Sequence, residues 1–591
     1  MTASEALAQL AADYWEGVLR RDPTMATFFG DYRYNDWLPD AGPEGRAAQE
    51  SALREVLRRL DGIPEGDLQP DERVSRDMLR LAAEQGLAAL PFRLDQMAVD
   101  QMGGPQVWLP ELLNWHPTDT AEHVDQLVAR YQAFGRYMDQ YLENLRDGVR
   151  DGRTATRMAT ERVVGQLRAL LETPPVESPL HEPAKAVPQQ ADGLLRALER
   201  TVYPAYQSML EFLQGEYLNE KARHEPGVWS VKDGDRIYPL LCRQHTTTEL
   251  TPDELHRIGL DELEGIHHEM RAIMARLGDG SGEIRAFTER LTRDPANLAA
   301  TREEIVQTAE RLLEQAQAAL PRAFGKLPQI PCRVKAIEEY RERDSVAAFY
   351  YPPAGDGSRG GIFYVNTYDP PSRPRHTMPA LTFHEAVPGH HLQIALSTEA
   401  KDLPEFRRLG ADVTAYVEGW ALYTERLSDE LGLYPDDQSR YGMLGYQAWR
   451  ACRLVVDTGM HHLHWSRQRG IDFFLQNVGL TERETVNEVD RYIIWPGQAL
   501  SYKIGQREIE ALRREASKRL GARFDLRAFH DAVLAHGAIP LSTLRATMTH
   551  WLERCLRVAG QPPLTHEEML AMHGAHAISD LPPERGPRGA A

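Results

Sequence analysis

Helical periodicity runs through almost the whole chain, and it constrains the fold more than any other feature of the sequence. Apolar residues recur at helical spacing in SEALAQLAADYWEGVLRR (residues 4–21), AAQESALREVLRRLDGI (47–63) and TAEHVDQLVARYQAFGRYMDQYLENLRDG (120–148). Thr251 and Glu254 have the spacing of a capping box at the start of another long helix. Because one core seldom spans 591 residues, the pattern predicts two packed lobes or one large helical body.

One short segment breaks this periodicity. CRVKAIEEY (332–340), SVAAFYYPP (345–353) and GIFYVNTYDPP (361–371) are rich in β-branched and aromatic residues and are separated by turn-forming residues. Helical spacing resumes at about Met378. We therefore predict a mainly α fold, with one small antiparallel sheet beside the segment that follows it.

Composition and charge exclude several classes of partner. The chain has 68 basic and 87 acidic residues, a formal charge of −19, which argues against nucleic acid or an anionic membrane as the main partner. The 4 cysteines are far apart and form no C-x-x-C pair, so they indicate neither a cysteine zinc ribbon nor a disulfide framework. The first residues lack a basic region followed by an apolar one, and no apolar run has the length of a membrane span. We expect a cytoplasmic protein.

The helical segment after the β-rich part opens with FHEAVPGHHLQ (383–393), a dense group of metal-ligating residues. In the common zinc-protease motif H-E-x-x-H, two histidines four apart lie on one helical face, and the glutamate holds the attacking water. Here Pro388 occupies the position four residues after His384. On a straight helix His390 would face away, and His391 would lie about 10.5 Å along the axis. Neither would reach an ion held by His384.

Pro388 and Gly389 change this geometry. Proline has no N–H to donate to the carbonyl of His384, and glycine accepts backbone conformations that other residues avoid. Removing the dipeptide restores the spacing HEAVH. We predict that Pro388-Gly389 forms a local bulge that returns His390 to the place of the second metal ligand, with His391 as the alternative.

A catalytic zinc ion needs a third protein ligand and an open position. The next helical segment, DVTAYVEGWALYTERL, places Glu418 among apolar and aromatic residues, where an unpaired carboxylate is costly. Coordination of a cation would relieve that cost. Glu425 lies seven residues further on the same face, next to Arg426. We predict Glu418 as the third ligand and keep Glu425 as the alternative.

Four motifs in order make the chain resemble a known family. HEAVPGHHLQ, YVEGWALYTERL, RLVVDTGMHHLHWS and YIIWPGQALSYKIG are similar to motifs of the bacterial family labelled domain of unknown function 885, and the likeness includes NTYDPPSRP before the first of them. That family is grouped with the gluzincin-type metallopeptidases, which are largely helical zinc enzymes. The resemblance implies one Zn²⁺ ion per chain, held by His384, His390 and Glu418, with Glu385 as general base. It also implies a metallopeptidase-like catalytic lobe, which we place at residues 251–581, after an N-terminal helical lobe at 1–250 and before a polar tail at 582–591. We expect the two lobes to pack as one continuous unit.

Other residues are candidates for supporting roles. Hydrolysis of an amide needs a donor to the developing oxyanion, and Tyr502 and Tyr492 flank a turn at Pro496-Gly497. His461 follows Asp457 by one helical turn, so Asp457 can orient it for substrate binding or for support of the metal site, and a structural Asp-His pair is the alternative. Arg453 has two interpretations, a receptor for a substrate carboxylate or an internal ion pair with Asp457. Packing roles for both tyrosines stay open.

A strand at the edge of the sheet could hold an extended peptide, and GIFYVNTY is the candidate. The function we predict is a zinc-dependent peptidase that acts on short peptides. Two alternatives stay open: a zinc hydrolase of a non-peptide amide or ester, and a non-catalytic helical binding protein. Intact Glu385 speaks against the last alternative, because a purely structural zinc site needs no general base.

Overall fold

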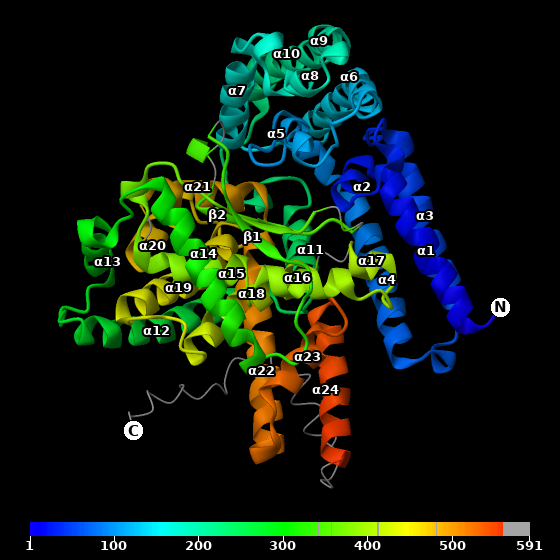
Figure 1. The fold of residues 1–591 in the computed structure, drawn as a ribbon. Coiled ribbons are helices and arrows are strands. Elements are labelled where there is room, and N and C mark those ends of the chain that lie inside the picture. Colours follow the sequence, from blue (N-terminus) through cyan, green and yellow to red (C-terminus); the bar gives the residue numbers. More distant parts are fainter. Residues whose placement is uncertain are drawn as a thin grey trace.

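The computed structural model is mainly helical, with one small sheet (Figure 1). It describes residues 1–339, 342–344, 346–355, 357, 359–410, 413–479 and 481–558. The prediction of a mainly α fold with one small sheet is confirmed, and the polar tail predicted at 582–591 lies outside the described residues. None of the described helices is both long enough and apolar enough to span a bilayer.

The helices before the sheet fall into three groups. The first group is α1 (Ala3–Arg21), α2 (Pro23–Phe29), α3 (Pro43–Asp61) and α4 (Pro70–Ala89). The second is α5 (Pro105–Glu111), α6 (Ala121–Asp151), α7 (Arg157–Glu172), α8 (Pro183–Ala186), α9 (Ala191–Ala197) and α10 (Tyr203–Phe212). The third is α11 (Gly234–Thr246), α12 (Pro252–Arg276), α13 (Ile284–Arg293) and α14 (Arg302–Ala319). The capping box predicted at Thr251 and Glu254 is present at the start of α12.

The helices after the sheet carry the candidate site. They are α15 (Met378–Glu385), α16 (His390–Glu399), α17 (Glu405–Arg408), α18 (Thr414–Glu430), α19 (Asp437–His461), α20 (Arg467–Asn477), α21 (Glu482–Ile494), α22 (Ser501–Leu520), α23 (Leu526–Leu534) and α24 (Leu541–Val558).

The sheet is mixed, whereas the sequence predicted an antiparallel one. Its strands are β1 (Cys332–Ala336), β2 (Ala348–Tyr351) and β3 (Gly361–Val365), in the order β1-β3-β2. β2 pairs with β3 antiparallel, and β1 pairs with β3 parallel. The residue pattern locates strands but does not determine which strand lies between the others. Because β3 is the central strand, both of its edges are paired, and the prediction that GIFYVNTY offers a free edge to a peptide is wrong.

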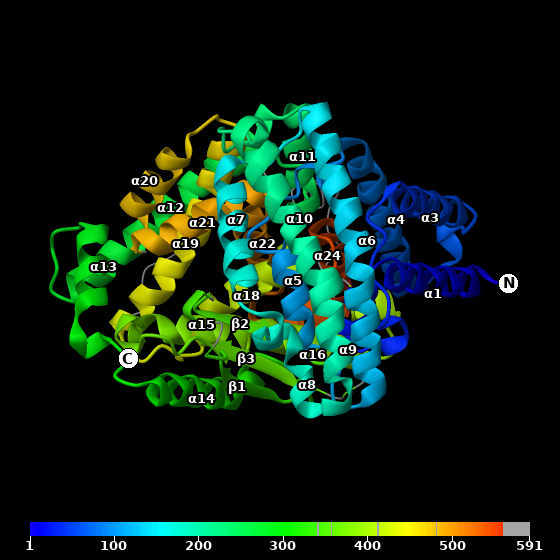
Figure 2. The ribbon, with the colours of Figure 1, turned by 90° about the horizontal axis from the view of Figure 1, so that it is seen from above.

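Two separate hydrophobic cores organise the helices. α5 to α10 pack around one core that runs in sequence from Val99 to Ala222. The larger core joins the first helices, from Leu7 to Phe92, with residues from Val228 to Leu556. In Figure 1 the helices α5 to α10 lie above the rest of the molecule. Figure 2, seen from above, shows α6 and α10 in front of the other helices. The N-terminal 250 residues thus contribute to both cores.

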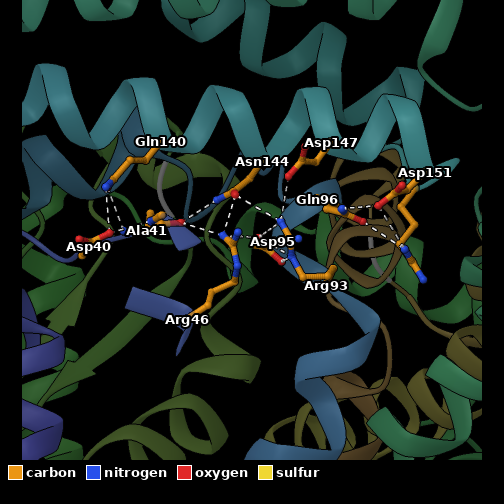
Figure 3. A network of polar contacts seen from close by, with 12 residues as sticks. Asp40, Ala41, Arg46, Arg93, Asp95, Gln96, Gln140, Asn144, Asp147 and Asp151 are labelled. Carbon is orange, nitrogen blue, oxygen red and sulfur yellow. Dashed lines mark hydrogen bonds and ion pairs between the residues drawn. The ribbon is translucent and has the colours of Figure 1, made fainter. Parts of the chain in front are cut away.

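One face of α6 carries a row of polar side chains that contact the segments around Asp40, Arg46 and Gln96 (Figure 3). Asn144 accepts a hydrogen bond of 2.8 Å from Arg46, and Gln140 donates one of 2.8 Å to Asp40. Further along, Asp151 accepts a hydrogen bond of 2.7 Å from Gln96. Gln140, Asn144 and Asp151 have helical spacing and share one face. These contacts fix the position of α6 against the segment before and at the start of α3 and against the segment that follows α4.

α18 and α22 approach each other through glycine. A Cβ atom at Gly505 would lie 1.7 Å from the carbonyl oxygen of Ala415, and one at Gly419 would lie 2.4 Å from the Cα of Gly505. No other residue fits at either position without moving a backbone. The close approach matters for the site because Glu418 precedes Gly419 on α18.

We predict that Gly505→Ala destabilises the protein by about 2 kcal/mol or more, because the added methyl group forces the two backbones apart. Urea unfolding followed by circular dichroism measures the change. Gly445→Ala is the matched control, since Gly445 lies inside α19 and a Cβ atom added there would meet nothing within 4 Å. That substitution should be neutral or stabilise by roughly 0.5–1 kcal/mol through helix propensity. Equal destabilisation by both substitutions would contradict the glycine-contact interpretation.

Candidate metal centre

The His-rich segment folds as two helices joined by a tight turn. α15 ends at Glu385, residues 386–389 form the turn, and α16 begins at His390. The Val387–Pro388 peptide bond is cis. A Cβ atom at Gly389 would lie 1.9 Å from the carbonyl oxygen of His384, so only glycine fits there. The interruption is therefore a break of four residues between two helices, whereas the sequence predicted a two-residue bulge inside one helix.

The turn brings His384 and His390 together, and α18 adds Glu418. The Nε2 atoms of both histidines lie 3.5 Å from Oε2 of Glu418. The two imidazole rings are nearly perpendicular, with centroids 4.8 Å apart. One ligand atom from each of the three residues lies within 4.8 Å of the others. These are the three residues that the sequence predicted as metal ligands.

The donor atoms of this cluster fit a divalent cation. Oε2 of Glu418, which faces the Nε2 atoms of both histidines, is buried and has no hydrogen-bond partner among the described residues. An unpartnered buried carboxylate oxygen is costly, and a cation between it and the imidazoles would remove that cost. Two imidazole nitrogens and one carboxylate oxygen are the ligand set of many catalytic zinc sites. The cluster is thus a candidate zinc centre with three protein ligands.

Glu425 stands behind His384 and not beside Glu418. Its Oε1 atom accepts a hydrogen bond of 2.9 Å from Nδ1 of His384, and its Oε2 atom accepts one of 2.9 Å from Gln447. Nζ of Lys503 in turn donates to Oε1 of Gln447 over 2.8 Å. A carboxylate on the far nitrogen of a metal-ligating histidine fixes its tautomer and orientation. The geometry gives Glu425 this supporting position instead of the ligand position we kept for it as an alternative.

His391 points away from the cluster. Its Nδ1 atom lies 2.9 Å from the hydroxyl of Tyr350, and its Nε2 atom donates to the carbonyl of Ile330 over 3.0 Å. Both ring nitrogens are therefore used in contacts with β2 and the chain before β1. Of the two adjacent histidines, only His390 is directed at His384 and Glu418.

The electrostatics of the cluster favour a positive charge. Burial opposes the charged form of His384, but Glu418 and Glu425 outweigh it and raise its pKa to about 9. Burial also acts against the charged form of Glu418, yet the two histidines hold its pKa well below the usual range. Burial raises the pKa of Glu385, and no hydrogen bond contributes to that shift. The carboxylates thus require a positive charge at the imidazoles, which protons or a cation can supply.

The predicted supporting residues belong to a neighbouring polar group. Tyr492 is buried, donates to Glu488 over 2.6 Å and accepts from Arg453 over 3.1 Å. Tyr502 accepts from Arg491 over 3.1 Å. These contacts give both hydroxyls structural partners.

His461 has a structural position. Its Nδ1 atom accepts from the backbone N–H of Val228 over 3.0 Å, and its Nε2 atom donates to the carbonyl of Tyr492 over 2.9 Å. Burial lowers its pKa to about 3. Asp457 does not orient it, contrary to the prediction, because Asp457 accepts instead from Tyr238 over 2.6 Å and from the N–H of Gly497.

Sequence reasoning missed Gln447 and Arg450. Both lie on α19, where Gln447, Arg450 and Arg453 follow one another at intervals of three residues. Polar residues at helical spacing in a helix that is otherwise apolar mark a face turned toward a buried site. That spacing was the available signal, and the sequence interpretation used only Arg453 of the three.

A cavity of about 460 Å³ lies at the junction of the two cores. Its walls include Val99, Ala155, Leu241 and Trp495, and none of the three clustered residues lines it. The cavity is thus distinct from the candidate metal centre.

The fold and the cluster define a large helical protein with a buried His-His-Glu centre. The chain belongs to a family described as bacterial protein of unknown function (DUF885), whose family model matches residues 23–548. A crystal structure of a "putative lipoprotein" from Colwellia psychrerythraea is similar, with a TM-score of 0.88 and 28% identity over 94% of this chain and 100% of that one. A second "putative lipoprotein of unknown function", from Shewanella oneidensis, has a TM-score of 0.72 and 19% identity over 92% of this chain and 99% of that one, which shows the fold alone. The search of curated proteins found no match.

The different directions of the adjacent histidines lead to a prediction. His390→Ala should weaken zinc binding by about 100-fold or more, because one of three ligands is lost, whereas His391→Ala should leave zinc affinity within about threefold. Competition with a chromophoric zinc chelator measures both affinities. Glu425→Gln should fall between them, with a loss of about 10- to 100-fold, because His384 loses its charged partner. A stronger effect of His391→Ala than of His390→Ala would contradict this assignment.

Proposed function

We propose that the protein is a zinc-dependent hydrolase, and most specifically a peptidase that cleaves short peptides. The observation that carries the proposal is the unpartnered Oε2 of Glu418, which lies 3.5 Å from the Nε2 atoms of His384 and His390. The carboxyl group of Glu385 follows the first of these histidines directly in the chain. A ligand set of this kind, followed directly in the chain by a carboxyl group that can act as general base, supports hydrolysis of an amide.

A bound zinc ion would polarise the substrate carbonyl and lower the pKa of a water molecule toward about 7. Glu385 takes the proton of the attacking water and delivers it to the nitrogen of the leaving amine. Glu425, at 2.9 Å from Nδ1 of His384, would keep this histidine in the tautomer that leaves Nε2 available to a bound ion.

The location of the protein is a separate proposal. We propose a cytoplasmic location. The word lipoprotein in the names of the two similar structures favours attachment to a membrane instead. Fractionation of cells that express the full chain, followed by immunoblotting, decides between the two.

The general-base role leads to a direct test. Glu385→Gln should retain one zinc ion per chain and lose about 10²- to 10⁴-fold in kcat, because glutamine cannot take up the proton. A library of dipeptides and tripeptides, with amino-acid release as the measured signal, provides the assay, and ester substrates are included in the same panel. Glu405→Gln, at an exposed position on α17, is the control and should keep full activity.

Two outcomes would count against the proposal. Undiminished turnover in Glu385→Gln would remove the assigned base. Turnover that persists after a chelator has removed the metal, and that zinc does not increase, would remove the metal from the reaction.

A further inference from the structure

Three buried or half-buried arginines lie together beside the candidate metal centre. We call Arg450 and Arg453 of α19 and Arg491 of α21 the arginine pocket. Arg450 and Arg453 are only 6% and 2% exposed. Aromatic rings pack against all three guanidinium groups. Tyr446 and Trp449 lie against Arg450, and Trp449 and Tyr502 lie against Arg453. Trp495 lies against Arg491.

Several donor atoms in this pocket have no acceptor within the described part of the chain. Nε and Nη1 of Arg450, Nη1 of Arg453 and Nε of Arg491 are shielded from solvent and have no hydrogen-bond partner among the described residues. Buried guanidinium groups are normally satisfied by carboxylates, carbonyls or water. Arg130 is an example in this chain, since it is 0% exposed and its Nε, Nη1 and Nη2 atoms all have partners, which include the carbonyls of Trp37 and Pro23. The unmet donors of the arginine pocket therefore call for an acceptor that comes from outside the chain.

The balance of charge in the pocket points the same way. Glu488 forms ion pairs with two of the three arginines, at 3.0 Å from Arg453 and 3.8 Å from Arg491. Arg450 has only a distant ion pair of 4.0 Å with Glu425, whose two oxygens already accept from His384 and Gln447. The internal pair of Arg453 with Asp457, one of our two interpretations of the sequence, does not form. The pocket thus has more positive than negative charge, and an anion would balance it.

The pocket is close to the metal centre. Glu425 lies between them, 4.0 Å from Nη2 of Arg450 on one side and 2.9 Å from Nδ1 of His384 on the other. An extended peptide advances about 3.5 Å per residue, so two or three residues span a separation of this size.

We infer that the arginine pocket binds the C-terminal carboxylate of a short peptide, and that the amide bond cleaved lies within about three residues of that terminus. Guanidinium forks suit this ligand because a carboxylate offers two acceptor oxygens in one plane. The cleavage position rests on the proposed peptidase function, whereas binding of the carboxylate does not. Tyr446 and Trp449 are partly exposed and lie against Arg450, so they are the side chains nearest the surface at this position.

The test compares peptides that differ only at the carboxylate. Calorimetric titration measures the affinity of tri-alanine, tri-alanine amide and Ala-Ala-Asp amide for the zinc-loaded Glu385→Gln variant and for the zinc-free native chain. We expect tri-alanine to bind about 10- to 100-fold more tightly than its amide, the range of a charge-assisted hydrogen-bonded pair. The Asp peptide, which has a side-chain carboxylate but no terminal one, should bind as weakly as the amide.

Variants identify the residue responsible. Arg450→Gln should bring the ratio of acid to amide affinity close to 1, and Arg450→Lys should retain part of it because the charge remains without the fork. Arg440→Gln is the matched control, since Arg440 lies on the same helix but pairs with Asp429 over 2.8 Å. Circular dichroism and the zinc content of each variant establish that the fold and the metal centre are intact.

The outcomes separate this inference from the proposed function. Equal binding of the acid and the amide, equal binding of the Asp peptide and tri-alanine, or no measurable binding of any of the three peptides would overturn it. A preference for the acid that is unchanged in Arg450→Gln would also overturn it. If Arg450→Gln does not fold, the comparison of the three peptides on the native chain still decides. A clear preference for the acid in a protein that hydrolyses no peptide would support the carboxylate site and reject the peptidase.

Discussion

The carboxylate of Glu418 between two imidazoles is the interaction on which the arrangement of the candidate centre depends. Two close backbone contacts bring it about, and both require glycine. Gly389 allows the chain to turn back against the carbonyl of His384, so that α16 starts with His390 beside it. Gly419 and Gly505 allow α18 to lie directly on α22, which sets the position of Glu418. The geometry of the candidate site thus depends on these close backbone contacts as well as on the identity of its three ligands.

Burial gives this arrangement its chemical character. Charged side chains are costly to bury unless partners compensate for the lost hydration. In the centre, Glu425, Gln447 and Lys503 form a continuous chain of hydrogen bonds behind His384. On the side of Glu418 that faces the imidazoles, the two histidines at 3.5 Å compensate for its charge, but its Oε2 atom has no hydrogen-bond partner in the described part of the chain. His384 is thus supported from behind, whereas Nδ1 of His390 has no hydrogen-bond partner among the described residues. A cation bound between the three side chains, as we propose, would satisfy their inner side.

The sequence predicted the local features well and the long-range ones less well. The helical class, the capping box at Thr251 and the three strands follow from spacing and residue type, which act over a few positions. The grouping of His384 with His390 follows from the proline-glycine interruption in the same way. The order of the strands and the position of Glu425 behind His384 depend on contacts between elements far apart in the chain, and no local pattern encodes them. His461 shows the limit clearly, because a histidine-rich stretch suggested chemistry and the side chain holds two backbone groups instead.

α19 connects the candidate centre to the arginine pocket. Gln447 supports Glu425 from this helix, and Arg450 and Arg453 follow at three-residue intervals on the same side. An α-helix is stiff over two turns, so the distance between the support of the metal ligand and the guanidinium groups varies little. A substrate held at both places would therefore have its amide carbonyl positioned before the reaction begins, and such positioning lowers the entropic part of the barrier. If the proposed substrate is bound at both places, the same rigidity would limit the number of residues between its terminal carboxylate and the cleaved bond, because the helix keeps the separation of the two places constant.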